Sequence, residues 1–382
     1  MSGMRIQGGM SEIFEMYQPH TLAQSELKND GPYLVYGANG VIGKHTSYNH
    51  EEAQVLVTCR GATCGTINVS APFSWINGNA MVIKPRKNNV DLAFLKYYLK
   101  SGIDIKKVIT GAAQPQITRQ SLSMLKVDLP PFEEQQRIAA ILDKTELIKS
   151  KRELAIEKLD ELAQSIFVEM FGDLVTNPKN FDVIELSKIC DLQNGFAFKS
   201  DDYIDSSNIL NCRMSNIRPN GEFNILYHPK YLPNHYADKY SSFLLNDGDV
   251  IIAMTDMAGE PKILGVPTIV DTQGYKLLLN QRVGKLIFKN QQPLSIKYLK
   301  YALSQPYVKQ YYRKFASGGV QINLGKKDLL SVEILLPSYE KQKVFDDLIS
   351  KLVTEKEKHV KAHQKIDMIS QSIKSIAFSG QL

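Results

Sequence analysis

Residues 133–171 read EEQQRIAAILDKTELIKSKRELAIEKLDELAQSIFVEMF and contain neither proline nor glycine, although Pro130 and Pro131 precede them and Gly172 follows. Apolar or small residues recur in this stretch at alternating steps of three and four. That spacing is typical of a coiled-coil seam and predicts one long helix. At 1.5 Å per residue the helix would be about 58 Å long, and a lone helix in water needs a packing partner. We therefore expect a second element to cover its seam.

The second half of the sequence repeats the first at an offset of 207 residues. Gly111-x-x-Gln114 corresponds to Gly318-x-x-Gln321, and another segment without proline or glycine, residues 340–378, corresponds to residues 133–171. Such a repeat is evidence about architecture before any single element is assigned. We predict that the two long helices pack as an antiparallel coiled coil. The predicted seam residues are Ile138, Ile141, Ile148, Leu159, Leu162 and Ile166 in the first helix and Phe345, Leu348, Leu352, Ile366, Ile369 and Ile373 in the second.

Short β-branched runs bounded by turn residues lie upstream of each long helix and predict strands. They fall at residues 53–59, 79–85, 126–130, 248–255, 284–289 and 331–337. Short helices are predicted at residues 92–100 and 294–304. The predicted fold class is α+β, with two globular domains of mixed α/β structure, two long helices and a pseudo-two-fold internal repeat. The predicted division is domain 1 at 1–131, helix 1 at 132–172, a linker at 173–185, domain 2 at 186–337 and helix 2 at 338–382.

The composition is that of a globular protein. With 382 residues, of which 43% are hydrophobic and 23% charged, the chain is long enough for two or three packed domains. Its four cysteines form no CxxC pair, and no His/Cys cluster has the spacing of a zinc site, so we expect reduced, buried thiols and no metal. We find no signal-peptide pattern and no run of eighteen apolar residues, and we predict a cytoplasmic location without membrane contact.

Motifs that would carry chemistry are weak. Leu129-Pro130-Pro131-Phe132 resembles the Asn/Asp-Pro-Pro-Tyr/Phe loop of amino-methyltransferases, but leucine cannot hydrogen-bond the target amino group. The glycines of residues 37–43 lack the GxGxxG spacing, and Pro261 interrupts an Asp…Glu-x-Lys nuclease pattern that begins at Asp249. No GxxxxGK[ST], HExxH or GxSxG occurs. We predict no catalytic residue, no metal and no cofactor bound by this chain.

Polar residues near turns are the remaining signal. The formal net charge is +6, and residues 133–171 carry more acidic than basic side chains, so the basic excess lies mainly in the globular parts and permits a polyanion partner. Arg, Lys, Asn and Gln contact phosphates and base edges. For each residue an ordinary solvated loop position is the alternative, and Arg60 and Arg282 could equally form internal salt bridges. The candidate DNA contacts are Asn39, Lys44, His45, Arg60, Thr63, Asn77, Lys84 and Arg86 in the first half and Lys199, Arg213, Asn216, Arg218, Thr255, Gln281 and Arg282 in the second.

The duplicated order of a variable region, Gly-x-x-Gln, Leu-Pro, Glu-x-Gln and a long helix resembles the specificity subunits of type I restriction-modification systems. Residues 36–43, 194–199 and 280–284 also resemble stretches common in that family. The likeness covers nearly the whole chain. In one respect the sequence departs from the family: only nine residues precede Met10, so we expect the leading strand of the first domain to be truncated.

The resemblance implies a division of labour. Each globular part would be a target recognition domain that reads one half of a bipartite double-stranded DNA site, and the helices would set the spacing between the halves. Two methylation subunits would dock on the helices, bind S-adenosylmethionine and methylate adenine at N6. Restriction subunits, where present, would add cleavage that depends on ATP and Mg. The residues themselves leave two other hypotheses open: a coiled-coil scaffold with protein-binding domains, and an autonomous DNA methyltransferase.

Overall fold

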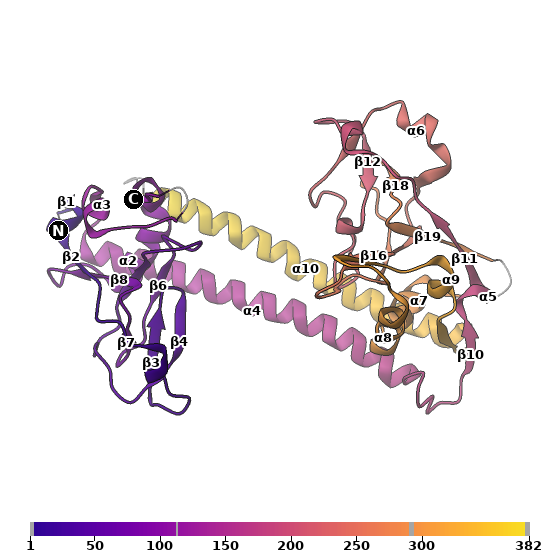
Figure 1. Cartoon of the computed structure of the whole chain (residues 1–382), viewed down its shortest axis with the longest axis horizontal. Helices are drawn as coiled ribbons and strands as arrows, with labels where there is room; N and C mark the ends of the chain where they lie inside the picture. The colour runs from indigo at the N-terminus through magenta and orange to yellow at the C-terminus, as the bar shows by residue number, and fades with distance from the viewer. Residues whose placement is uncertain (1–3, 112–113, 290–293, 379–382) are drawn as a thin grey trace. The chain divides into compact units, whose positions relative to one another are not determined.

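The chain folds into two compact units. The computed structural model describes residues 4–111, 114–289 and 294–378 (Figure 1). Unit 1 comprises Met1–Ile156 and Lys358–Leu382, and unit 2 comprises Glu157–Glu357. Each unit therefore combines a globular part with a portion of each long helix. Residues 112 and 113 of the first Gly-x-x-Gln motif, and residues 379–382 of the predicted second helix segment, lie outside the described residues.

Unit 1 is built from short strands and short helices around two clusters of buried side chains. Its strands are β1 (Ile6–Gly9), β2 (Phe14–Tyr17), β3 (Tyr33–Gly37), β4 (Gly40–His45), β5 (Val55–Thr58), β6 (Ile67–Val69), β7 (Trp75–Ile76), β8 (Ala80–Pro85) and β9 (Lys126–Leu129). Its short helices are α1 (Met10–Ile13), α2 (Leu92–Tyr97) and α3 (Arg119–Ser123).

Two sheets form the body of unit 1. The first has the order β2-β8-β5-β6, and the second has the order β4-β3-β7, in which β3 and β7 are parallel. All four residues of β5 are buried, because apolar side chains cover both faces of this central strand. The sheet that contains β3, β4 and β7 lies at the lower end of unit 1 in Figure 1.

Unit 2 repeats this plan with more elements. Its strands are β10 (Asp182–Glu185), β11 (Cys190–Asn194), β12 (Ile209–Cys212), β13 (Tyr231–Leu232), β14 (Leu244–Leu245), β15 (Val250–Ala253), β16 (Thr255–Met257), β17 (Pro267–Ile269), β18 (Lys276–Leu279), β19 (Val283–Phe288), β20 (Gln321–Asn323) and β21 (Glu333–Leu336). Its short helices are α5 (Leu186–Ile189), α6 (Tyr236–Lys239), α7 (Ile296–Leu303), α8 (Pro306–Phe315) and α9 (Lys326–Leu330).

Two sheets of unit 2 correspond to the two that form the body of unit 1, and the two-stranded sheet β16-β20 is additional. One has the order β11-β19-β15-β17, and another has the order β13-β12-β18-β14, in which β12 and β18 are parallel. The sequence did not predict α8, which follows α7 after a break at Ser304 and Gln305 and begins with Pro306 at its first turn.

The leading strand of unit 1 is present. Strand β1 pairs with β9, with Ile6 opposite Leu129, in the same way that β10 pairs with β21, with Asp182 opposite Leu336. Both leading strands are four residues long. The expectation that this strand is truncated in the first domain is therefore wrong.

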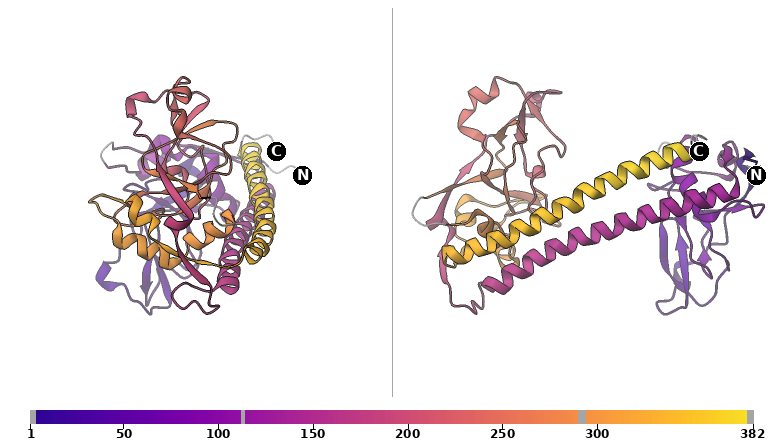
Figure 2. Two further views of the ribbon diagram at one scale, coloured as in Figure 1. Left: turned by 90° about the vertical axis from the view of Figure 1, so that its right-hand side faces the viewer. Right: turned by 180° about the vertical axis from the view of Figure 1, so that it is seen from behind.

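The two long helices are α4 (Phe132–Phe171) and α10 (Tyr339–Phe378), as predicted within one residue at their starts. In unit 1 their portions run side by side, with Lys149 paired to Asp367 and Glu153 close to His363 (Figure 2). In unit 2, Asp160 is paired to Lys356, and the ring of Phe171 lies 5.4 Å from that of Phe345. Within each unit, the residue numbers of the partners decrease along α10 as they increase along α4, so the two helices pair antiparallel.

The structure corrects part of the predicted seam. Ile138 and Phe345 are buried, and Leu159, Ile166, Leu352, Ile366 and Ile373 are half-buried. The other five predicted seam residues are 36–54% exposed: Ile141, Ile148, Leu162, Leu348 and Ile369.

Neighbouring residues take their place in the interior. Ala139, Leu142, Ala163, Phe167 and Ile349 are buried in the cores of the units. The physical reason is that each helix packs on a globular part as well as on its partner. The buried stripe is therefore broader than a heptad seam and is rotated relative to it.

Candidate nucleic-acid interface

Each unit contains the same asparagine turn at the end of its parallel strand pair. In unit 1 the amide of Asn77 donates to the carbonyl of Tyr36 over 2.9 Å, and in unit 2 the amide of Asn280 donates to that of Cys212 over 3.1 Å. The turns close with matching bonds, from Ala80 to Asn77 (3.0 Å) and from Val283 to Asn280 (2.9 Å). Tyr36 and Cys212 therefore occupy equivalent positions in the two units, and the segments that follow them start from the same place in the fold.

Further backbone bonds bring other segments to this turn. The amide of Cys59 donates to Asn79 over 3.1 Å and its carbonyl accepts from Ile117 over 2.8 Å. In unit 2 Met254 makes the same two bonds, to Arg282 over 3.0 Å and from Leu324 over 2.8 Å. We call the resulting surface the loop edge of each unit. It comprises residues 37–39, 59–63, 77–79, 111 and 114–117 in unit 1 and residues 213, 254–258, 280–282 and 318–324 in unit 2.

The glycines of the two Gly-x-x-Gln motifs lie at the loop edge with a positive φ angle. Gly111 has φ 84° and Gly318 has φ 142°, a region that disfavours residues with a side chain. A Cβ atom on either glycine would overlap the carbonyl oxygen of the following Gln114 or Gln321. The repeated glycines are therefore required by backbone geometry.

Three of the candidate contacts in unit 1 come together at its loop edge. Asn39, Arg60 and Thr63 are exposed there. The hydroxyl of Thr58 donates to the carbonyl of Ala38, which holds the tip of the β3-β4 hairpin beside the end of β5. An arginine, an amide and a hydroxyl on one surface are groups suited to contacting bases and phosphates.

Four other candidates of unit 1, the exposed Lys44, Lys84 and Arg86 and the half-buried His45, lie elsewhere. Lys44 and His45 are at the far end of β4, where the His45 ring lies 5.3 Å from that of Trp75. Lys84 and Arg86 are at the end of β8 away from the asparagine turn, and Nε of Arg86 donates to the carbonyl of Ser11 over 3.1 Å. The structure does not bring these four residues to the loop edge.

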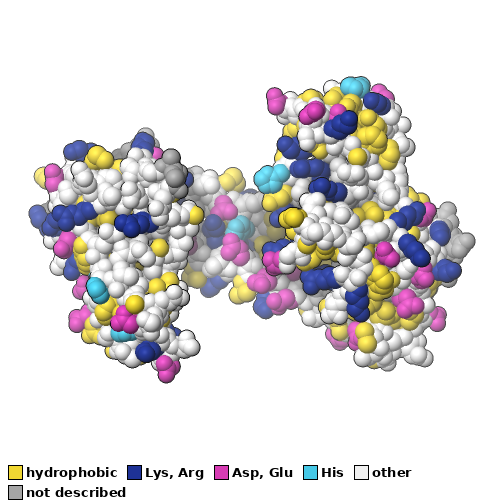
Figure 3. Space-filling model, in the orientation of Figure 1, with side chains coloured by type: hydrophobic (Ala, Val, Ile, Leu, Met, Phe, Trp, Pro, Cys, Tyr) yellow, Lys and Arg dark blue, Asp and Glu magenta, His cyan; other side chains and the backbone are white. Residues whose placement is uncertain are grey.

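In unit 2 the loop edge carries Arg213, Gln281 and Arg282. Gln281 and Arg282 are exposed, and Arg213 is half-buried with one guanidinium nitrogen donating to the carbonyl of His228 over 2.6 Å. Lys199 is exposed on the segment that leaves Phe196, whose carbonyl accepts from the Gln281 amide. Lys and Arg side chains gather over the upper part of unit 2, the part that contains β12 and β18 (Figure 3).

The alternative that Arg60 and Arg282 serve as internal salt-bridge partners is not supported. Both side chains are exposed, and no ion pair in the described part of the chain includes either of them. Both guanidinium groups therefore remain available to a partner.

Three predicted contacts are wrong, because their side chains are buried and hydrogen-bonded within the fold. Asn77 is 4% exposed and its Oδ1 accepts from the Leu22 amide over 2.9 Å. Thr255 is 3% exposed and its hydroxyl donates to Oδ1 of Asn323 over 2.7 Å. Asn216 is 1% exposed. Asparagine and threonine are common in turns for their own hydrogen bonds, so residue type alone does not separate the two roles.

Asn216 organises a loop that has no counterpart in unit 1. After Tyr36 the chain of unit 1 turns back at once into β4, whereas after Cys212 it continues through residues 213–230, which we call the unit 2 loop. Oδ1 of Asn216 accepts from the Arg213 amide over 2.8 Å. Its Nδ2 donates to the carbonyls of Asn224, Ile225 and Tyr227 over 3.0–3.3 Å. Part of the greater length of the second globular part therefore lies directly at the loop edge.

Arg218, the remaining candidate, lies in the unit 2 loop. Its guanidinium carbon is 3.9 Å from the centroid of the Tyr227 ring, which places the charge over the aromatic face. This stacking holds a half-buried cation in a fixed position.

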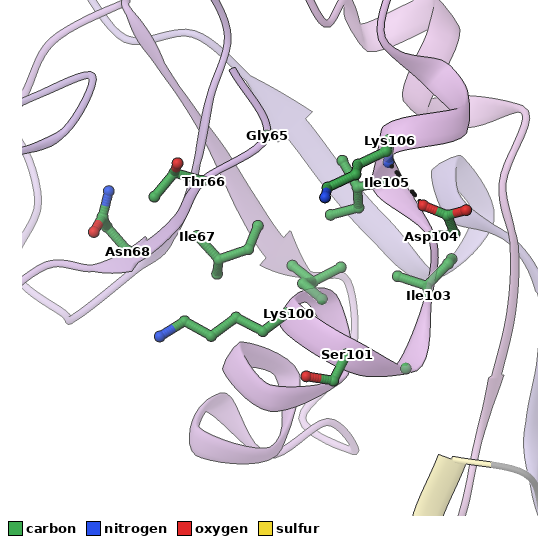
Figure 4. Close-up of a pocket in the computed structure, with 12 residues that line it drawn as sticks. Gly65, Thr66, Ile67, Asn68, Lys100, Ser101, Ile103, Asp104, Ile105 and Lys106 are labelled. Carbon is green, nitrogen blue, oxygen red and sulfur yellow. Dashed lines mark hydrogen bonds between the residues drawn. The ribbon is translucent and has the colours of Figure 1, made fainter. Parts of the chain in front are cut away.

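Unit 1 has a polar cavity of about 800 Å³ that the sequence did not predict. Lys100 and Lys106 line it together with Thr66 and Asn68, and Asp104 contributes the single carboxylate, which accepts from the Lys106 amide over 3.2 Å (Figure 4). Thr66 is the last residue of the turn that contains Thr63, since its amide donates to the Thr63 carbonyl over 3.0 Å. The two lysines therefore add positive charge next to the loop edge.

Two kinds of reactive site, a metal-ligand cluster and a reactive thiol, find no support among the described residues. They contain no group of three or more His, Cys, Asp or Glu that could hold a metal ion. All four cysteines are free, and burial raises the pKa of Cys59 to about 11 and that of Cys190 to about 12, so their thiolates are scarce at neutral pH. No helix in the part of the chain described is long and apolar enough to cross a membrane.

Comparisons with known proteins agree with this organisation. A sequence model of the family described as "Type I restriction modification DNA specificity domain" matches residues 9–158 and 178–365. The chain is 27% identical over 381 residues to the type I restriction enzyme MjaVIII specificity subunit of Methanocaldococcus jannaschii, covering 91% of this chain and 87% of that protein.

Two solved structures have a similar fold. The first is the S subunit of a type I restriction-modification system from M. genitalium, with a TM-score of 0.62, 15% identity, and coverage of 97% of this chain and 95% of that one. The second comes from a study of complex assembly and conformational transition in a type I system, with a TM-score of 0.56, 15% identity, and coverage of 99% and 98%.

Proposed function

Because the chain belongs to the family of type I restriction-modification DNA specificity domains, we propose that each of its two units reads one half of a bipartite double-stranded DNA site. The chain is a specificity subunit, and such subunits are non-catalytic. Its role is to select the DNA on which other subunits act.

The main support for this proposal is that the two units share one pattern of backbone hydrogen bonds at the loop edge but expose different side chains there. The asparagine turn and the strand end recur in both units through matching hydrogen bonds, and so does the pairing of Thr110 with Gln116 and of Ser317 with Asn323 around the Gly-x-x-Gln motif. At equivalent loop edges, however, unit 1 presents Asn39 and Arg60, and unit 2 presents Gln281 and Arg282. Arginine suits guanine, and asparagine or glutamine suits adenine, through paired hydrogen bonds in the major groove. Two unlike sets of side chains on a shared frame support a site with two unlike halves.

In this proposal, partner subunits catalyse the methylation and cleavage of the DNA. Two methylation subunits bind S-adenosylmethionine and methylate an adenine in each half-site, and restriction subunits, where present, use ATP and Mg. This chain would supply their docking surface on its long helices. Support comes from apolar side chains that the fold leaves exposed: Leu147, Leu154, Met368 and Ile369 in unit 1 and Val168, Val344 and Val353 in unit 2, each 45–61% exposed. Leu147 and Leu154 are seven residues apart, so they lie on the same face of α4, as the apolar residues of an interaction surface do.

Duplex binding as a function of salt tests the proposal against a protein-binding scaffold. We expect the chain, assembled with methylation subunits, to bind a duplex that contains both half-sites, with log affinity falling linearly as log salt rises, because phosphate contacts release counterions. An affinity that is independent of salt would favour the scaffold. Methyl transfer by the purified chain alone would favour an autonomous methyltransferase, and we expect none.

A further inference from the structure

The unit 2 loop is attached to the long helices by a charged contact within unit 2. Nζ of Lys356, on α10, lies 2.6 Å from Oε1 of Glu222 in the loop. The same ammonium group donates to both carboxylate oxygens of Asp160, on α4, over 2.7 and 2.8 Å. The Lys356 side chain is only 15% exposed, so this three-membered contact is better shielded from solvent than an ordinary surface ion pair.

Glu222 is joined to Arg218 by a hydrogen-bonded turn. The Arg218 amide donates to the Glu222 carbonyl over 2.9 Å, and the Gly221 amide donates to the Arg218 carbonyl over 2.8 Å. The hydroxyl of Thr268 fixes the turn further by donating to the Gly221 carbonyl over 2.8 Å. A short path of bonds therefore leads from the helix to the guanidinium group that is stacked on Tyr227.

The electrostatics keep Glu222 ionised. Burial by itself raises the pKa of this carboxyl, but hydrogen bonds with Lys356 and Asn220 and the charges of Lys356 and Lys300 more than offset it and hold the pKa below its usual value. Burial likewise opposes the charge on Lys356, but its bonds to Asp160 and Glu222 raise its pKa. Both partners are therefore charged at neutral pH.

The internal repeat shows that the contact between Lys356 and Glu222 is present in unit 2 in addition to the ion pair that both units share. Lys149 and Lys356 are separated by the repeat offset of 207 residues, and so are Asp160 and Asp367. Unit 1 accordingly contains the equivalent helix-to-helix ion pair, between Lys149 and Asp367. Among the residues described, no acidic side chain from the globular part of unit 1 forms an ion pair with Lys149. The equivalent lysine of unit 2, Lys356, therefore has a second partner, Glu222, because the longer loop reaches the helix.

We propose that Lys356 is a positioning residue for DNA recognition: its ion pair with Glu222 sets the unit 2 loop, and with it Arg218, relative to Arg213 and Arg282 at the loop edge. This inference rests on the proposed function, because it assumes that unit 2 reads a half-site. It assigns to a helix residue a role in the specificity of one half-site only.

Methylation of a panel of duplexes tests the inference with the assembled complex. Each duplex carries one altered base pair in either the unit 1 or the unit 2 half-site. We expect Glu222→Gln and Lys356→Ala to reduce discrimination at the unit 2 half-site by about 5- to 30-fold and to leave the unit 1 half-site unchanged. Lys356→Arg, which keeps the charge, should restore discrimination. Lys149→Ala is the matched control and should change neither half-site.

The variants separate positioning from general stability. Glu222→Gln leaves the Lys356–Asp160 pair intact, so it tests the loop contact even if Lys356→Ala weakens the helix pairing. Normal discrimination by Glu222→Gln at the unit 2 half-site would overturn the inference, as would an equal loss at both half-sites with Lys356→Ala. Arg282→Ala in the same assay tests the proposed function independently. If it relaxes the unit 2 half-site while Glu222→Gln does not, only the inference fails.

Discussion

Gln135 and Gln342 make the same hydrogen bonds in the two units. Oε1 of Gln135 accepts from the Asp91 amide over 2.9 Å, and Nε2 donates to the Pro130 carbonyl over 2.8 Å. Gln342 does the same with Ser295 and Pro337, over 2.8 and 2.9 Å. Each glutamine thus joins the start of a long helix to the N-cap of a short one, which explains why the glutamine of Glu-x-Gln recurs in the sequence.

Replacing either glutamine with alanine should destabilise its own unit. Gln135 and Gln342 are 0% and 1% exposed, so Gln135→Ala or Gln342→Ala leaves buried backbone groups without partners, at a cost of about 1–3 kcal/mol for each group. Denaturant unfolding measures the loss. The exposed neighbour provides the control: Gln136→Ala should have little effect, and an equal effect of Gln135→Ala and Gln136→Ala would contradict this account.

The register of the helix pair predicts which deletions are tolerated. Removing residues 147–153 from α4 deletes Lys149 and Glu153, and with them the contacts to Asp367 and His363. It also shifts one end of the helix by about 10.5 Å relative to α10, so the remaining contacts between the two helices should be misaligned in one of the units. Removing residues 363–369 as well deletes the matching partners and should restore the pairing. Thermal unfolding of the two variants checks this prediction, and the methylated motif of the double deletion should show an altered gap between half-sites. A single deletion as stable as the double one would argue against the register.

Exposed leucines on α4 should contribute to assembly. Leu147→Gln with Leu154→Gln should weaken binding of the methylation subunit about tenfold or more, because burying a leucine is worth about 1.5–3 kcal/mol. Titration calorimetry measures the affinity, and circular dichroism should show unchanged helix content. Ser150→Gln with Lys151→Gln alters the same helix without removing apolar area and should leave binding intact. Unchanged binding by the leucine variant would exclude this surface.

The loop contact should be sensitive to acid. Because the folded pKa of Glu222 lies below its usual value of 4.5, the contact stabilises the fold at pH values above 4.5, and this contribution is lost as the pH falls through the folded pKa. The stability difference between the wild-type chain and Glu222→Gln should therefore be constant near neutral pH and shrink in acid. Urea unfolding at a series of pH values checks the trend. A difference that grows as the pH falls would have the wrong sign.

The long helices and the repeat could be predicted because each has a direct signal in the sequence. The helix is indicated by the periodicity of apolar residues in 133–171, and the repeat by the constant offset between matching residues of the two halves. The sequence did not predict which of two adjacent apolar residues faces the interior. Ile141 and Leu142 are equally apolar, but the globular part of unit 1 buries Leu142 and leaves Ile141 exposed. Periodicity within a helix carries no information about a domain that packs on it from elsewhere in the sequence.

The candidate interface was predictable only in part, for a similar reason. Asn39 and Asn77 are both asparagines in turns, and only the tertiary fold shows that one is exposed and the other binds the Leu22 amide. The contact of Lys356 with Glu222 joins residues 134 positions apart, which no local pattern indicates. The repeat could nevertheless have suggested the helix pairs, since Lys149 and Asp160 recur as Lys356 and Asp367.

Methylation-aware sequencing of host DNA tests the central claim most directly, by comparing the wild-type chain with Arg60→Ala and Arg282→Ala. Each lost arginine contact should relax recognition at its own position by about 1–3 kcal/mol. We predict that Arg60→Ala broadens one half of the methylated motif and that Arg282→Ala broadens the other, with the gap unchanged. Broadening of the same half by both variants, or of both halves by either one, would contradict the claim that each unit reads its own half-site.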